Sequence, residues 1–140
     1  MTAQEYKHIQ NLAWLVLIDS GTNSLPIELS LIESLYKINT FDDNYFGQAI
    51  EISSELLSMY GMNCNYSGTL AIMILSPLIV LKEIGVRSAE DLSMLTGLPM
   101  GIAINRYDKL KWFMKQNTFK IPNLERKVLK QFLPWIISNY

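Results

Sequence analysis

The stretch Leu70-Ala71-Ile72-Met73-Ile74-Leu75-Ser76-Pro77-Leu78-Ile79-Val80-Leu81 decides the fold, because it is the most apolar run in the chain. A helix that crosses a bilayer needs about 20 consecutive apolar residues. This run is shorter, and Ser76 and Pro77 interrupt it. The sequence therefore predicts a helix buried in the core of a compact domain, and no membrane partner.

Helical periodicity continues on both sides of this run. From Gln4 to Asp19 the apolar residues recur at the spacing of one helical face, and they are Ile9, Leu12, Ala13, Val16 and Leu17. A second helix is predicted from the start signal at 24–26 to about residue 38, followed by a loop at 39–44. Further helices are predicted over 45–60, 88–97 and 99–116, and a last one from 123 to a break near Pro134. No segment shows sustained two-residue alternation. The predicted fold is therefore mainly α, a single domain of about six helices over 1–140.

Length and composition exclude several classes of protein. A chain of 140 residues holds one domain, and 49% apolar against 18% charged residues argues against disorder. His8 is the only histidine and Cys64 the only cysteine, so a histidine pair or a cysteine cluster cannot form within this chain. We expect no metal and no cofactor. The start of the chain lacks the basic and apolar pattern of a leader, so the cytoplasm is the expected compartment.

Charge is distributed unevenly. Residues 1–81 carry 2 basic and 8 acidic side chains, whereas residues 82–140 carry 10 basic and 5 acidic ones, so the parts have charges of −6 and +5. Such asymmetry is found in proteins whose basic surface binds nucleic acid. It is also found where two oppositely charged halves of a domain pack together, or where charged side chains solvate one face. The total of −1 gives little long-range attraction for phosphates.

The segment 88–110 has the pattern of a helix-turn-helix, with a turn at 96–99. Base readout would come from the start of its second helix, where Pro99 to Ile104 offer no donor or acceptor side chain. Four basic residues could still contact phosphates, and they are Arg87, Lys109, Lys111 and Lys115. A helix-turn-helix DNA-binding regulator is therefore the alternative hypothesis, and DNA the alternative partner.

A scattered but ordered set of residues carries a resemblance to a known family. The set is Leu25-Pro26-Ile27-Glu28-Leu29, then Ala71, Leu75 and Pro77, then Ser88, Asp91 and Leu92, then Leu98, Ala103, Arg106 and Leu110. In this order the chain resembles the ImmA/IrrE metallopeptidases of bacterial and mobile-element operons. The resemblance implies peptidase-like helices over 1–84 and helix-turn-helix-like and C-terminal helices over 85–140. The small β-sheet of that family is expected to be reduced or lost, because the linker before the active-site helix is short.

The catalytic residues that the resemblance implies are missing. The family's centre is a histidine-glutamate-x-x-histidine helix, in which two imidazoles bind zinc and the glutamate activates water. Here the corresponding segment is 54–58, with Ser54 and Ser58 in place of the histidines and only Glu55 retained; a competing frame is 50–54, with Glu51. Tyr66 stands near the expected third ligand. Hydroxyl groups do not replace imidazole for Zn²⁺, so we expect no enzyme.

Arg106 is predicted to be a structural residue. It falls on the apolar face of its helix with Ala103 and Leu110, where a guanidinium needs partners. The sequence predicts that Arg106 bridges two elements, with Asp91, Glu51 or Glu55 as acceptors.

The function that these observations favour is that of a non-catalytic, ImmA/IrrE-like pseudo-peptidase. It would act by binding another protein, as a regulator or an inhibitor, and the resemblance implies a prophage or other mobile element as its source. The predicted binding surface is the former cleft, formed by Glu51, Ser54, Glu55, Ser58 and Tyr66. Exposed aromatic residues are expected to add to it, with Trp112, Trp135 and Tyr140 as candidates.

Overall fold

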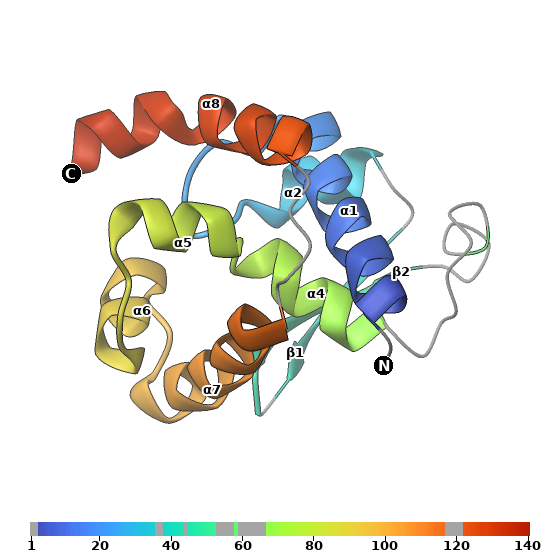
Figure 1. The fold of residues 1–140 in the computed structure, drawn as a ribbon. Helices are drawn as coiled ribbons and strands as arrows, with labels where there is room; N and C mark the ends of the chain where they lie inside the picture. Colours follow the sequence, from blue (N-terminus) through green and yellow to red (C-terminus); the bar gives the residue numbers. More distant parts are fainter. Residues whose placement is uncertain (1–2, 36–37, 44, 53–57, 59–66, 117–121) are drawn as a thin grey trace.

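A computed structural model describes residues 3–35, 38–43, 45–52, 58, 67–116 and 122–140. It is mainly helical, as predicted (Figure 1). The helices are α1 (Ala3–Ser20), α2 (Leu29–Leu35), α4 (Ser67–Leu75), α5 (Leu78–Ile84), α6 (Ala89–Thr96), α7 (Met100–Gln116) and α8 (Pro122–Asn139). Two strands, β1 (Ile38–Asp43) and β2 (Gly47–Ile52), form an antiparallel hairpin.

The helices surround α4, which lies in the middle of the molecule (Figure 1). Helix α1 packs against α4, α2 and α8, and α8 also covers α5. Strand β2 packs against α4, and α6 pairs with α7. Residues from the first and last parts of the described chain therefore share one core.

The apolar run that begins at Leu70 forms the centre of the core, as predicted. Every side chain from Leu70 to Leu78 is buried, and so are Val80 and Leu81. Pro77 divides the run into α4 and α5, because its nitrogen carries no proton for a helical hydrogen bond. Burial of each large apolar side chain contributes about 1.5–3 kcal/mol, so this run is a main source of stability.

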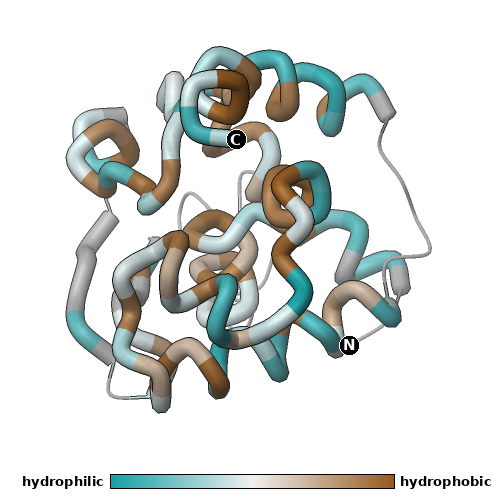
Figure 2. The backbone as a smooth tube through the Cα atoms, turned by 90° about the vertical axis from the view of Figure 1, so that its left-hand side faces the viewer, coloured by the Kyte–Doolittle hydropathy of each residue, from teal (hydrophilic) through white to brown (hydrophobic). Residues whose placement is uncertain are grey.

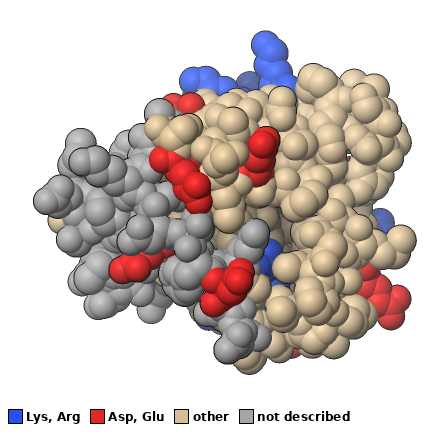
Figure 3. Space-filling model, turned by 180° about the vertical axis from the view of Figure 1, so that it is seen from behind, with Lys and Arg blue, Asp and Glu red and all other residues tan. Residues whose placement is uncertain are grey.

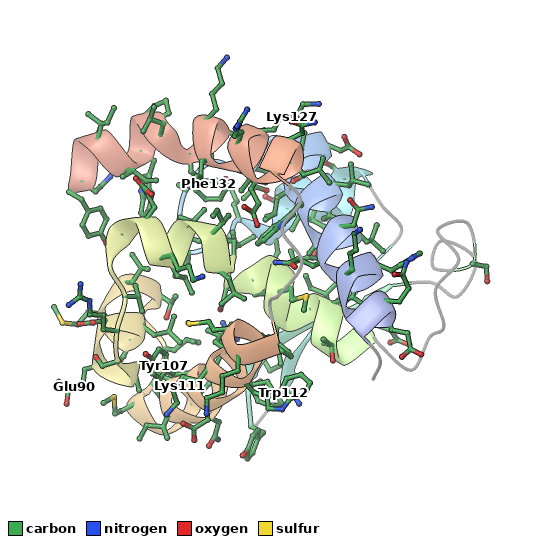
Figure 4. The ribbon with its side chains drawn as sticks, in the orientation of Figure 1. Glu90, Tyr107, Lys111, Trp112, Lys127 and Phe132 are labelled. Atoms are coloured by element: carbon green, nitrogen blue, oxygen red, sulfur yellow. The ribbon has the colours of Figure 1, made fainter. Side chains whose placement is uncertain are left out.

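The outer helices each bury one face. All five residues of the predicted α1 face are buried, together with Trp14. On α8, Phe132 points into the molecule and Lys127 points away from it (Figure 4). The colours of Figure 2 accordingly alternate between hydrophobic and hydrophilic turns along the helices. The predicted break of the last helix near Pro134 is wrong, because Pro134 lies on the exposed side and α8 continues to Asn139.

Gln131 joins α8 to the end of α1. Its side-chain nitrogen donates hydrogen bonds to the carbonyl oxygens of Leu17, at 2.7 Å, and of Thr22, at 2.5 Å. The last carbonyls of a helix have no partner within the helix. Gln131 therefore completes the C-terminal end of α1 from the opposite end of the chain.

The predicted loop at 39–44 and the predicted helix over 45–60 are wrong where the structure describes them. Residues 38–43 and 47–52 are paired strands, with Ile38 opposite Ile52 and Asp43 opposite Gly47. In β2 the buried Ile50 is followed by the exposed Glu51, which is the alternation of a half-buried strand. The described residues therefore include one two-stranded antiparallel sheet.

Gly47 places the hairpin tightly against the α6–α7 unit. Its φ is +88°, and a Cβ at this position would lie 3.1 Å from both Arg106 Nη2 and Leu98 Cδ2. The left-handed backbone angle favours glycine, and an added carbon would have to displace these side chains by a few tenths of an ångström.

We expect Gly47→Ala to lower the free energy of unfolding by about 2–4 kcal/mol, because it adds left-handed strain to a close contact. Gly97→Ala is the matched control, since Gly97 has a φ of +74° but nothing within 4 Å of the added carbon. The control should lose about 1–2 kcal/mol. Urea unfolding measures both losses, and equal losses would contradict the close packing of Gly47.

Candidate functional site

Arg106 is buried, and it bridges two elements as predicted. Its side chain is 3% exposed. Its Nε donates to the carbonyl oxygen of Phe46 at 3.0 Å, its Nη2 donates to the same oxygen, and its Nη1 lies 3.4 Å from Ser76 Oγ. Arg106 thus connects α7 to the hairpin turn and to the residue that follows α4.

The predicted pairing of Arg106 with Asp91 is wrong. Asp91 is exposed and caps α6: its carboxylate accepts from Arg87 N at 2.9 Å, and its own N–H donates to Ser88 Oγ at 3.1 Å. An acid three residues after the N-cap serine satisfies free N–H groups at a helix start. The serine-x-x-aspartate spacing of Ser88 and Asp91 is typical of such a cap, but it gives no information on which residues Arg106 reaches.

Only two residues of the predicted cleft surface lie in the described part of the chain. Glu51 is exposed on β2, and Ser58 is exposed. Because Glu51 is in a strand, it does not share a helical turn with Glu55, and the frame 50–54 is not a helix through residue 52. Ser54, Glu55 and Tyr66 lie outside the described residues.

An open groove between the hairpin turn and α7 is a candidate site that the sequence does not predict as a unit. It has a volume of about 350 Å³ and is lined by Tyr45, Phe46, Asn105, Asp108, Lys109 and Trp112. Asn105 Nδ2 donates to the carbonyl oxygen of Tyr45 at 3.0 Å, next to the bonds from Arg106 to Phe46. Two consecutive polar side chains of α7 therefore hold two consecutive carbonyl groups of the turn. We call this site the turn–α7 groove.

Two exposed aromatic side chains form the walls of the turn–α7 groove. Tyr45 is 57% exposed and Trp112 is 42% exposed, and the Tyr45 ring meets the Phe46 ring edge to face at 4.6 Å. Figure 4 shows Trp112 beside the hairpin, whereas Tyr107 and Lys111 lie on the other side of α7. Tyrosine and tryptophan are enriched where proteins bind other proteins.

The groove holds a cation near its aromatic wall. Lys109 Nζ lies 5.2 Å from the centre of the Trp112 ring and 5.7 Å from that of Phe113. Asp108 also lines the groove, but Lys111 Nζ lies 3.6 Å from its carboxylate. With Asp108 paired to Lys111, the ammonium group of Lys109 is the positive charge that remains beside the Trp112 ring.

The four predicted phosphate contacts do not share one surface. Arg87 precedes α6, whereas Lys109, Lys111 and Lys115 are on α7. Lys109 and Lys111 are two residues apart on the helix, so they point to nearly opposite sides. Lys111 also lies 5.6 Å from the Tyr107 ring. Seen from behind, basic side chains show mainly along the upper edge, and acidic side chains lie close to some of them (Figure 3).

The remaining candidates occupy separate places. His8 is exposed on α1, with its Nε2 2.8 Å from Gln4 Nε2, and Cys64 lies outside the described residues. Within the part of the chain that the structure describes, no three His, Cys, Asp or Glu residues are placed to hold a metal ion.

A second hollow of about 290 Å³ lies at the end of α8, lined by Ile84, Gly85, Val86, Asp91, Met94, Leu95 and Tyr140.

Comparisons with protein families, curated proteins and solved structures give no match to this chain. Among the described helices, none alone has the length and hydropathy needed to cross a bilayer. The segments Gly68–Ile84 and Ala89–Thr96, which are bent by 114° relative to each other, reach those limits only together.

We expect Arg106→Met to lower the free energy of unfolding by about 2–4 kcal/mol, because the Phe46 carbonyl and the Ser76 hydroxyl lose their donor. Arg106→Lys should also be destabilising, since an ammonium group cannot reproduce the planar fork. Thermal and urea unfolding measure both. Unchanged unfolding of Arg106→Met would show that the bridge does not stabilise the fold.

Proposed function

We propose that this chain is a non-catalytic protein-binding domain that acts as a regulator or inhibitor. The turn–α7 groove is the observation that carries this proposal. It combines exposed Tyr and Trp side chains with a positive charge on a backbone fixed by Asn105 and Arg106. A surface whose backbone is fixed before binding loses less conformational entropy when a partner docks.

A non-catalytic role follows from the residues that this chain supplies. A zinc peptidase of the ImmA/IrrE type needs two histidines one helical turn apart, and the sequence contains only His8. A cysteine nucleophile needs a base such as histidine, and the one histidine of the sequence, His8, is exposed on α1 beside Gln4. Binding remains the function that these side chains can perform.

The burial pattern supports a descent from ImmA/IrrE-like peptidases as part of the proposal. The apolar residues of the resemblance from Ala71 onward are mostly core residues: Ala71, Leu75, Pro77, Leu92, Ala103 and Leu110 are all buried. Ser88 caps α6 and Arg106 bridges to the hairpin. On this proposal the chain kept the packing of a peptidase encoded by a prophage or mobile element and lost its catalytic residues.

The DNA-binding alternative has weaker support. The start of α7 presents the exposed residues Met100, Gly101 and Ile104. Recognition helices of helix-turn-helix proteins contact base edges with their first residues, and specific contacts need side chains such as Arg, Asn and Gln. This surface suits contact with a protein better than the reading of bases.

We expect Trp112→Ala and Tyr45→Ala each to weaken capture of the partner about thirtyfold, because aromatic hot spots contribute about 2 kcal/mol or more. The measurement is affinity capture from host lysate with the tagged full chain, quantified by mass spectrometry. Ile137→Ala is the matched control, since Ile137 is a more exposed apolar side chain on α8.

Equal capture by the wild type and both aromatic variants would show that the turn–α7 groove is not the binding surface. Salt-dependent retention of labelled duplex DNA, lost in Arg87→Ala and Lys115→Ala, would favour the helix-turn-helix alternative instead.

We expect purified protein to contain well below one zinc ion per chain, because the serines of segment 54–58 are poor zinc ligands. Elemental analysis after dialysis measures the metal. Tightly held zinc in stoichiometric amount, or peptide hydrolysis that a chelator abolishes, would contradict the non-catalytic proposal.

A further inference from the structure

We infer that the turn–α7 groove binds an extended segment of the partner protein in which a carboxylate side chain neighbours a large apolar one. The carboxylate would pair with Lys109, and the apolar side chain would lie between Tyr45 and Trp112. This inference rests on the proposed function and names the chemistry of the partner.

The charges lining the groove favour an acidic partner. Lys109 is half-buried, and among the described residues no carboxylate pairs with it. Asp108, the acid of the groove, already has Lys111 at 3.6 Å. A partner that brings a carboxylate therefore meets an unneutralised cation, whereas a basic partner would meet Lys109 directly and compete with Lys111 for Asp108. Charge complementarity of this kind selects between partners.

The position of Lys109 strengthens this preference. Its Nζ lies over the faces of Trp112 and Phe113, at 5.2 and 5.7 Å from the ring centres. Ring faces attract the ammonium group and hold it near the aromatic wall. A carboxylate that reaches Lys109 is thus brought beside Trp112, which is why an apolar neighbour of that carboxylate would contact the indole.

The shape of the groove favours side chains of an extended segment. Its volume of about 350 Å³ is near the lower end of the range of about 300–1,000 Å³ for enclosed ligand sites. The groove is open to solvent, because its wall residues Tyr45 and Trp112 are both exposed. An extended chain can lay adjacent side chains along such a surface without a folded domain entering it.

A single-stranded nucleic acid is the competing occupant, because bases stack on aromatic side chains beside basic ones. Lys109 is the one basic side chain among the described lining residues, whereas a phosphate backbone is bound through several basic side chains. The chain also carries a net charge of −1. A protein segment is therefore the better fit.

The test is selection of random dodecapeptides displayed on phage against the immobilised full chain. Wild type should enrich peptides with Asp or Glu next to an aromatic or large aliphatic residue. The best peptide, measured in solution, should bind Lys109→Glu about tenfold more weakly, because attraction becomes repulsion. Lys127→Glu is the matched control, since Lys127 projects from α8 away from the molecule (Figure 4). Exchange of the peptide's acid for Lys should restore binding to Lys109→Glu.

The outcomes separate this inference from the proposed function. Peptides that bind Trp112→Ala as well as wild type would overturn the groove as a binding surface, and with it the proposed function. Peptides that need Trp112 but lack an acid, or that prefer Lys and Arg, would overturn only the carboxylate inference. Retention of a labelled single-stranded oligonucleotide that is lost in Trp112→Ala would also overturn it.

Discussion

The hydrogen bonds from the Arg106 guanidinium to the Phe46 carbonyl connect α7 to the turn of the hairpin, 60 residues earlier in the sequence. A guanidinium taken out of water costs several kcal/mol unless its N–H groups find acceptors, and here Phe46 and Ser76 supply them. Gly47 follows Phe46, and its missing side chain leaves the space in which the guanidinium lies. The neighbouring Asn105 holds Tyr45 in the same way. The position of the hairpin turn, and so the shape of the turn–α7 groove, depends on this one buried charge.

The helical part of the fold could be predicted from local pattern. The α1 face, the buried run from Leu70, the Ser88 cap and the end of α6 at Gly97 all follow from residues within a few positions of each other. The hairpin could not be predicted in this way. Its pairing of Ile38 with Ile52 is not local, and the apolar spacing after Tyr45 also fits a helical face.

The candidate site was predicted only in fragments. Burial of Arg106 followed from the apolar helix face, and Trp112 and Lys109 were selected for unrelated reasons, as an exposed aromatic and a phosphate contact. Tyr45 falls in a predicted helix, although it lies in the turn, and no sequence pattern singles out Asn105. What unites these residues is a contact across 60 positions of sequence, between α7 and the turn. Periodicity within one element carries no information on such a contact.

The link from Gln131 to Leu17 and Thr22 has a consequence for biosynthesis. Helix α1 packs against α8, so the hydrophobic stripe of the first helix acquires this cover only after more than 100 further residues have left the ribosome. Until then only α2 and α4 can cover α1, and nascent chains that expose apolar surface bind chaperones or aggregate.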